Sequence, residues 1–510
     1  MRRLLFFLII CLLISLFAAC SRQPGKDIDE TSTPEVKANE KNLDSIGNNV
    51  EFPDPSLYLS HDGQPDIRQV SANLYFYDEK NNRLVPEARQ ILKWNETNAT
   101  TGIIYELVKG PKDSSLKPVI SPDTKVIKIE QTENILSVNL SGGFLASDSL
   151  MIARAALVNT LTGLEGLKYI KIYVEGRELT SNGKDDGIVL GLLTRYPNSI
   201  AEIQEEESQY IEGAAVRRVN RELFFPDANG IYLLSEVRAI AISNGDAVRS
   251  IVEELIKGPA SPDSGLYPSL PKGTKLNNLL VVDGQDEGKD QITLYFSKEF
   301  KSQFDGGSAQ ETATLGSLVY SLTSLPNIGS VKIYYQNEKG YYTDAPLHDI
   351  SLRKGLTEEQ FPDLLGKRIR VYFPDKQGSY LIPEYRAMLR TDTKVPERIL
   401  EKLLTSPTNP DSKAVLPDGI PRNEFKIVKI IENTAIVNLP SAFFGDREGN
   451  KCSIQGLYAI VNSLTDPVNT RDILQVRFIV DNKIVDEYMG ISLDDPFVPN
   501  PALTASAKID

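Results

Sequence analysis

The sequence of 510 residues has two histidines, three cysteines and one tryptophan. His61 and His348 lie far apart, so neither a histidine-rich metal site nor a repeated serine–histidine pair is available. No nucleophile elbow, phosphate-binding loop or zinc-protease helix occurs along the chain. The sequence therefore predicts a protein with no catalytic residues, no bound cofactor and no metal site.

The shortage of cysteine also argues against a disulfide framework. Cys11 lies within an N-terminal apolar run, Cys20 follows that run, and Cys452 stands alone near the start of a predicted helix. If Cys20 is modified, the mature chain has no cysteine pair left. We interpret Cys452 as a packing residue and expect stability to come from apolar cores.

Positive charge is in deficit as well, because 56 lysines and arginines face 69 acidic residues and the formal net charge is −13. A nucleic-acid-binding protein needs a cationic surface. We therefore expect no nucleic-acid partner.

The N-terminus has the layout of an export signal. Arg2 and Arg3 precede an apolar run over residues 4–17, and Ala18-Ala19 lead into Cys20. This pattern resembles a bacterial lipoprotein signal, in which the cysteine is acylated, for example with palmitate, and becomes the first mature residue. We expect residues 1–19 to be the signal peptide, Cys20 to be the lipidation site, and the chain to be lipid-anchored at the extracytoplasmic face of the membrane. An ordinary secretory signal or an uncleaved anchor remains the alternative.

Residues 20–70 are polar and carry too few apolar side chains to offset the entropy of ordering them. We predict a disordered tether that begins at the lipidated cysteine.

Most of the remaining chain is one module repeated three times. Four groups of residues recur in the same order about 150 residues apart, which indicates triplicated domains. The first group is Tyr75-Phe76-Tyr77-Asp78, Phe224-Phe225-Pro226-Asp227 and Tyr372-Phe373-Pro374-Asp375. The second is Lys109-Gly110-Pro111, Lys257-Gly258-Pro259 and Thr405-Ser406-Pro407, and the third is Thr160-Leu161-Thr162, Ser321-Leu322-Thr323 and Ser463-Leu464-Thr465. The fourth is the closing strand, Lys171-Ile172-Tyr173, Lys332-Ile333-Tyr334 and Arg477-Phe478-Ile479.

Hydrophobic periodicity predicts the order strand, strand, helix, strand, strand, helix, strand in each copy. This order favours an α+β fold of three tandem βαββαβ-like modules, with helices packed on one face of a small mixed sheet. We place the modules at residues 71–200, 221–355 and 369–496, the connectors at 201–220 and 356–368, and a C-terminal tail at 497–510.

Several side chains have predicted places in this fold. We expect Phe144, Phe300 and Phe443 to fill the cores, and the Gly-Pro pairs to end the first helices. Arg154 is expected at the rim of its helix, and the acidic run at residues 205–207 is expected to face solvent. We expect no polar constellation to recur across the modules.

The repeated anchors resemble the GerMN module of sporulation and germination lipoproteins. Tyr-Phe-x-Asp, Leu-x-x-Gly-Pro, the strand Val138-Asn139-Leu140-Ser141 and Thr-Leu-Thr carry the resemblance. It implies a fold similar to the ring-building motif of secretion-type assemblies. The implied activity is architectural, within the envelope between mother cell and forespore.

We therefore expect a non-catalytic scaffold or assembly factor of the cell envelope, with envelope or sporulation proteins as partners. The alternative is a factor that binds or processes peptidoglycan, including a cell-wall hydrolase that uses scattered carboxylates. Exposed strand edges and flat apolar patches would favour assembly, whereas a deep acidic groove lined with tyrosine would favour glycan.

Overall fold

The computed structural model describes residues 69–92, 99–184, 187–208, 216–243, 246–261, 265–286, 289–304, 307–416, 422–445 and 454–504. These all belong to one of the two units into which the chain divides, residues 42–510. The predicted signal peptide, Cys20 and nearly all of the tether, together with His61 and Cys452, lie outside the described residues. Among the described helices, none combines the length and apolarity needed to span a membrane.

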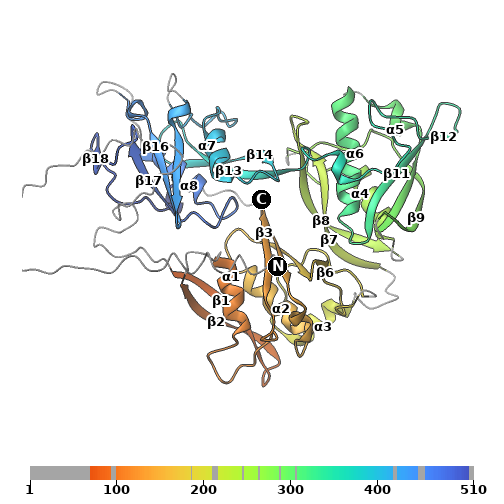
Figure 1. The fold of residues 1–510 in the computed structure, drawn as a ribbon, viewed down its shortest axis with the longest axis horizontal. Helices are drawn as coiled ribbons and strands as arrows, with labels where there is room; N and C mark the ends of the chain where they lie inside the picture. Colours follow the sequence, from red (N-terminus) through yellow and green to blue (C-terminus); the bar gives the residue numbers. More distant parts are fainter. Residues whose placement is uncertain are drawn as a thin grey trace, which may run out of the picture. The chain divides into compact units, whose positions relative to one another are not determined.

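The predicted order of elements is confirmed in all three modules (Figure 1). The first module contains β1 (Gln69–Asp78), β2 (Arg83–Leu92), α1 (Ala99–Val108), β3 (Val126–Thr132), β4 (Ile135–Leu140), α2 (Leu150–Leu161) and β5 (Tyr169–Val174), followed by β6 (Arg177–Glu178) and α3 (Ile200–Glu207). The second contains β7 (Val216–Pro226), β8 (Leu233–Ser243), α4 (Ala247–Lys257), β9 (Leu276–Asp286), β10 (Lys289–Phe296), α5 (Glu299–Ser302), α6 (Gly307–Thr323), β11 (Ile328–Gln336) and β12 (Tyr342–Thr343). The third contains β13 (Gly366–Pro374), β14 (Leu381–Leu389), α7 (Val395–Leu403), β15 (Lys426–Ile431), β16 (Thr434–Leu439), α8 (Ile454–Leu464), β17 (Gln475–Val480), β18 (Glu487–Tyr488) and β19 (Ile491–Ser492).

Each module has one main sheet of mixed direction, so the predicted α+β class is confirmed. The strand orders are β3-β4-β5-β6, β9-β10-β11-β12 and β15-β16-β17. The first pair in each sheet is antiparallel and the second is parallel, because the second helix crosses over between the two parallel strands.

The first two strands of each module form a separate hairpin, which the sequence did not place. In the second module α6 packs against both β7 and β11, and α4 packs against both β8 and β9. The helices thus lie between the hairpin and the main sheet, an order of layers that Figure 1 shows for this module. The helices cover one face of the main sheet, as predicted, and the hairpin adds a third layer.

Each module buries its own core. The three largest clusters of buried apolar residues are drawn from residues 72–203, 219–361 and 369–493, and Ile436 and Ile479 form a small fourth one. Phe144, Phe300 and Phe443 are fully buried in them, as predicted. Burying one such side chain contributes about 1.5–3 kcal/mol.

The Gly-Pro pairs end the first helices as predicted. α4 ends at Lys257, and Gly258 caps it with a φ of 82°, a backbone conformation that residues with a Cβ atom rarely adopt. Gly110 takes the corresponding conformation after α1, with φ of 90°. The third module has Ser406 at this place, and α7 ends earlier, at Leu403.

Two expectations about the first module are wrong. Arg154 is buried with 1% of its surface exposed, and its guanidinium is paired with Glu207. The reason is α3, which the sequence did not predict: its Ile200 and Ile203 join the core. Glu205 in the same acidic run stays exposed, whereas Glu207 faces inward and also accepts a 2.9 Å hydrogen bond from the Tyr196 hydroxyl.

The positive charge of the buried Arg154 is balanced by the negative charge of Glu207. Burial by itself lowers the pKa of Arg154, but Tyr196 and Glu207 outweigh burial and raise the pKa. The arginine therefore stays charged inside the module.

Candidate functional site

The residues that catalysis would require are sparse in the described part of the chain. His348 is half exposed, and its Nε2 lies 3.0 Å from the carboxylate of its neighbour Asp349. Within the described ranges no group of three or more His, Cys, Asp or Glu side chains could hold a metal ion. The sequence-based expectation of no catalytic, cofactor or metal site remains a prediction for the whole chain.

A polar network does recur in every module, contrary to expectation. It starts from a Glu-x-Arg sequence on the second hairpin strand, eleven residues after the repeated phenylalanine. The three copies are Glu87-Ala88-Arg89, Glu236-Val237-Arg238 and Glu384-Tyr385-Arg386. This constant spacing was visible in the sequence and could have revealed the network.

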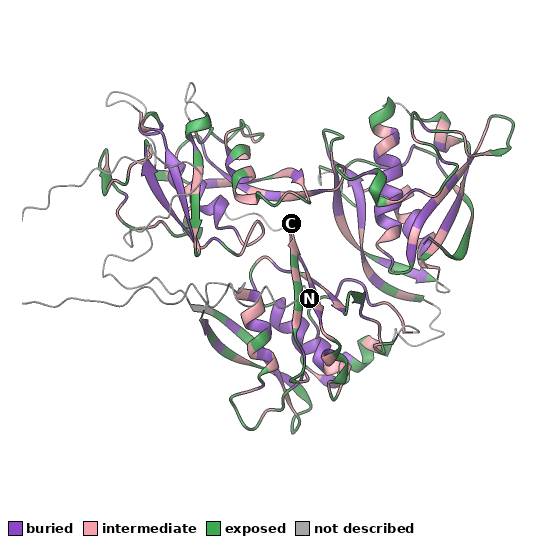
Figure 2. Cartoon of the chain, viewed as in Figure 1, coloured by how far each residue is buried: buried purple, intermediate pink, exposed green. Residues whose placement is uncertain are grey.

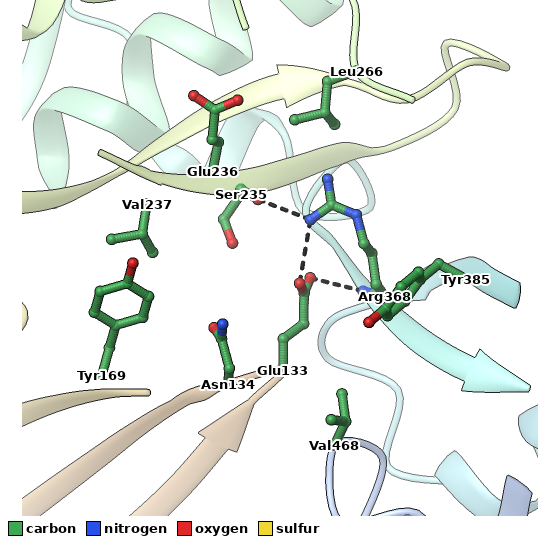
Figure 3. A pocket seen from close by; sticks show the side chains of 10 residues that line it. All are labelled: Glu133, Asn134, Tyr169, Ser235, Glu236, Val237, Leu266, Arg368, Tyr385 and Val468. Atoms are coloured by element: carbon green, nitrogen blue, oxygen red, sulfur yellow. Dashed lines mark hydrogen bonds and ion pairs between the residues drawn. The ribbon is translucent and has the colours of Figure 1, made fainter. Parts of the chain in front are cut away.

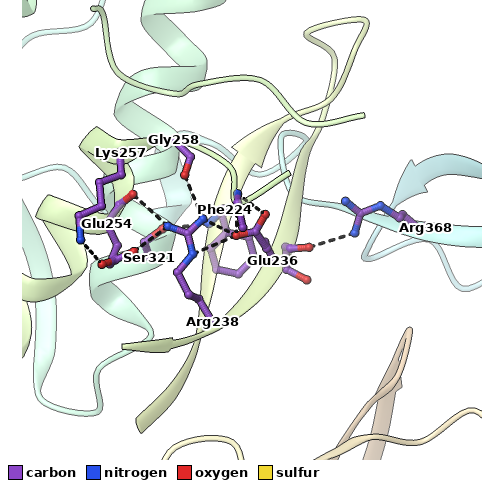
Figure 4. A network of polar contacts seen from close by, with 10 residues as sticks. Phe224, Glu236, Arg238, Glu254, Lys257, Gly258, Ser321 and Arg368 are labelled. Atoms are coloured by element: carbon purple, nitrogen blue, oxygen red, sulfur yellow. Dashed lines mark hydrogen bonds and ion pairs between the residues drawn. The ribbon is translucent and has the colours of Figure 1, made fainter. Parts of the chain in front are cut away.

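In the second module the arginine binds the end of the first helix (Figure 4). Arg238 donates from Nη2 to the carbonyl oxygen of Gly258 at 2.9 Å and from Nη1 to the carboxylate of Glu254 at 2.7 Å. Its guanidinium carbon lies 5.7 Å from the centre of the Phe225 ring. A cation at this end of α4 is favourable because the helix dipole is negative there.

The glutamate of the same sequence holds the loop that follows the helix. Glu236 accepts a hydrogen bond from the backbone N–H of Ala260 at 3.0 Å, and it is paired with Arg238. In the first module Glu87 accepts from the backbone N–H groups of Lys112 and Asp113 at 3.0 and 3.1 Å. Burial alone would raise the pKa of Glu87, but these backbone donors and the adjacent arginine outweigh it and lower the pKa.

The network differs in the third module. Arg386 donates to the carbonyl oxygen of Ser406 at 3.0 Å and pairs with Glu384 at 2.7 Å. The helix residue that corresponds to Glu254 is Lys402, so no helix carboxylate is present at this place. The Nε atom of Arg386 is buried and makes no hydrogen bond.

The other repeated anchors also serve the fold. A hydroxyl on the second helix accepts the backbone N–H of the first hairpin strand in all three copies: Thr160 from Tyr75 at 3.1 Å, Ser321 from Phe224 at 3.1 Å, and Ser463 from Tyr372 at 2.9 Å. The repeated aspartate binds the hairpin turn, as Asp227 does by accepting from the N–H groups of Ile231 and Tyr232. The repeated polar side chains are therefore engaged within their own modules.

Side chains from all three modules line one cavity of about 480 Å³ (Figure 3). Its charged groups do not form an acidic groove, because Arg368 donates to Glu133 from its backbone N–H at 2.9 Å and from Nη1 at 3.2 Å. The same Nη1 donates to the Ser235 carbonyl oxygen at 3.0 Å. Glu236 lines the cavity but is engaged by Arg238 within its own module. The cavity therefore contains an ion pair that hydrogen bonds hold in place, and the three apolar cores remain separate.

The open surface of greatest interest is the edge strand β9. In the described sheet β9 pairs only with β10, and its other side pairs with no described strand. Leu280, Val281 and Val282 are 49%, 46% and 41% exposed. Figure 2 shows most of this strand as exposed. An apolar edge with free backbone groups is a template for pairing with another strand.

The equivalent edges of the other modules carry charges where β9 has none. Leu280 lies opposite Thr293 on the central strand, and the matching partners are Glu130 opposite Ser137 and Lys429 opposite Ile436. Two positions further along the central strand, Asn278 of β9 corresponds to Lys128 and Lys426. Ile127 and Ile430 are exposed on these other edges, but each lies next to a lysine. Charged side chains blunt an edge against pairing. Among the three described edges, β9 has an uncharged stretch at residues 276–282, which ends at Asp283.

The outer face of the same sheet carries a cluster of tyrosines. Tyr295 and Tyr334 stack with ring centres 5.3 Å apart, and Tyr342 meets Tyr295 edge-on at 5.1 Å. Asn277 donates to the Tyr342 hydroxyl at 3.1 Å. The rings therefore contact one another across three strands.

Comparison with known proteins gives two kinds of match. A family model described as Germane, sporulation and spore germination, matches residues 73–180, 222–340 and 370–486, together more than half of the chain. No curated protein matches.

Several solved structures are similar to parts of the chain, among them two of one protein. The tandem GerMN domains of the sporulation protein GerM from Bacillus subtilis are 20% identical, with 56% of this chain and 100% of that chain covered and a TM-score of 0.24. The first GerMN domain of the same protein is 21% identical, with 25% and 98% covered and a TM-score of 0.22.

The three matched segments coincide with the three modules built around β4, β10 and β16. On this evidence the chain belongs to the Germane family of sporulation and spore germination, with three GerMN domains in tandem.

Proposed function

We propose that this protein is a non-catalytic scaffold of the cell envelope in sporulation or germination, anchored to the outside of the membrane through a lipid on Cys20. The observation that carries the proposal is the open edge of β9, where Leu280, Val281 and Val282 are exposed within an uncharged stretch of the strand. Docking of an extended strand on such an edge uses backbone hydrogen bonds for affinity and alternating side chains for specificity.

Two further observations support a scaffold. The repeated anchors hold each module together, and the guanidinium of Arg238 is engaged by Glu236, Glu254 and the end of α4. Three modules, each with its own core, provide three separate sets of surfaces. A membrane anchor with more than one acyl chain would hold that set at the bilayer stably.

The experiment places a photo-reactive residue at position 280 of the full-length chain in sporulating cells. The matched control carries the same residue at Ile231, which is 58% exposed in the hairpin turn of the same module. We expect protein adducts from position 280 and few from position 231. If irradiation yields no protein adduct at position 280, and deletion of the gene changes neither spore formation nor germination, the proposal is refuted.

Peptidoglycan binding is a second candidate, favoured by the tyrosine cluster at Tyr295, Tyr334 and Tyr342. Tyrosine rings next to amide groups such as Asn277 offer apolar faces together with hydrogen-bond donors. The test is sedimentation of the full-length chain with purified peptidoglycan, compared with Tyr295→Ala, together with an assay for muropeptide release. Neither retention nor release would remove this candidate.

A further inference from the structure

We infer that the strand which docks on β9 is β9 of a second copy of this chain, so that two copies join their second-module sheets across a two-fold axis. This inference rests on the proposed function and names the partner of the same edge.

The geometry of antiparallel pairing defines the register. A two-fold axis perpendicular to the sheet places residues of the same face opposite one another, so a residue on the axis meets its own copy. With the axis at Leu280, that residue lies opposite Leu280 of the second copy, Leu279 lies opposite Val281, and Asn278 lies opposite Val282. Residues 278–282 contain no charged side chain.

This pairing brings apolar side chains together on both faces of the joined sheet. Leu280 and Val282 lie opposite Thr293 and Gln291 of β10, and therefore on the outer face. Leu279 and Val281 lie opposite Leu294 and Ile292, whose side chains belong to the core on the helix face. Pairing thus covers the apolar groups that are now 41–49% exposed on β9.

The same symmetric pairing is unfavourable for the other two modules. An axis at the equivalent place on β3 would set Glu130 against Glu130, and on β15 it would set Lys429 against Lys429. Like charges directly opposite one another destabilise a strand pair. Of the three equivalent edges, only β9 is complementary to itself.

The expected affinity of one β9 strand for the other is modest. Five paired residues on each side bury less than the roughly 1,200 Å² of a typical stable interface. Holding two copies in one membrane raises their effective concentration, and pairing is then expected at the membrane before it is seen in dilute solution.

The first test traps the pair as a disulfide in membranes that carry the full-length chain with Cys452→Ser as background. Leu280→Cys is expected to give a covalent dimer, because its two copies lie directly opposite one another within disulfide range. Asn278→Cys is the register control, since its two copies would be about 13 Å apart along the strands. Ile231→Cys controls for random collision.

The second test measures recovery of one tagged copy with a differently tagged copy. Leu280→Lys should abolish co-recovery, and it should not disturb folding because Lys429 occupies the equivalent position in the third module. Ile231→Lys makes the same change of charge on another exposed residue and should leave co-recovery intact.

Two outcomes would overturn the inference. One is a dimer that forms equally from positions 280, 278 and 231, or from none of them. The other is a photo-adduct at position 280 with a different protein while tagged copies fail to recover each other. The second outcome would contradict the dimer but not the proposed scaffold function. Conversely, a symmetric dimer in cells whose gene deletion leaves spore formation and germination normal would contradict the scaffold function but not the dimer.

Discussion

The recurring Glu-x-Arg network leads to a prediction about how much one buried arginine stabilises its module. Arg89 has a side chain only 3% exposed, and it donates to Glu87, to Glu106 and to the Gly110 carbonyl oxygen. Replacing Arg89 with Met keeps the apolar stem but leaves Glu87 without its cation and leaves Glu106 paired with Lys109 alone. Breaking a buried ion pair in this way costs about 3–5 kcal/mol.

The third module supplies the internal comparison. Arg386 pairs with a single carboxylate, Glu384, because Lys402 replaces the helix glutamate, and its side chain is 16% exposed. We expect Arg386→Met to cost less than Arg89→Met by roughly one charge-assisted hydrogen bond, about 1.5–3 kcal/mol. We also expect Lys402→Glu to stabilise the third module by about 0.5–1 kcal/mol, since it restores the missing carboxylate.

The assay is amide hydrogen exchange on the full-length chain, because three modules with separate cores need not unfold together. Free energies of opening would be read from β1, β2 and α1 for the first module and from β13, β14 and α7 for the third. Protection of the untouched modules serves as the control in each variant. Equal losses in the two modules, or a destabilising effect of Lys402→Glu, would refute the role given to the helix carboxylate.

Three further predictions concern other charges and the anchor. Glu207→Ala should lower the opening free energy of α2 by about 3–5 kcal/mol, because it leaves the guanidinium of Arg154 buried without its carboxylate, and hydrogen exchange of α2 would show this. The pKa values of Glu106 and Glu254 are lowered because hydrogen bonds from neighbouring lysine and arginine outweigh burial. Their contribution to the free energy of unfolding is therefore complete above the ordinary carboxyl pKa of 4.5, and it is lost as the pH falls through their lower pKa values in the folded protein. Acid titration of stability should therefore be flatter in Glu106→Gln and Glu254→Gln than in the unmodified chain. Cys20→Ala should abolish incorporation of labelled palmitate and release the chain from membranes; an unmodified labelling pattern would contradict the lipid anchor.

The order of strands and helices could be predicted because it depends on local patterns. The paired apolar residues of α4, such as Ile251 and Val252, repeat at helical spacing and are buried in the structure. The strand β10 alternates between core residues such as Leu294 and outer residues such as Tyr295. Gly258 and Pro259 end the helix through backbone sterics, which neighbours along the chain already determine.

The candidate site was less accessible from the sequence. The Glu-x-Arg sequence keeps one spacing in all three copies, so the signal was present, but its partners Glu254 and Gly258 lie on another element. The environment of Arg154 depended on whether α3 folds over it, and eight residues with three consecutive acids have no strong signal for a buried contact. The special status of β9 required knowing which strand lies at the edge of the sheet.

The sequence by itself determined three repeats of one α+β module, the succession of their elements and the residues that fill their cores, because periodicity and helix-ending residues act over a few positions along the chain. Only the tertiary structure decided which strand has a free side, which charges are paired inside, and that Leu280 stands where Glu130 and Lys429 stand in the other modules. Those properties depend on contacts between segments far apart in the chain, and such contacts arise only when the sheet is assembled.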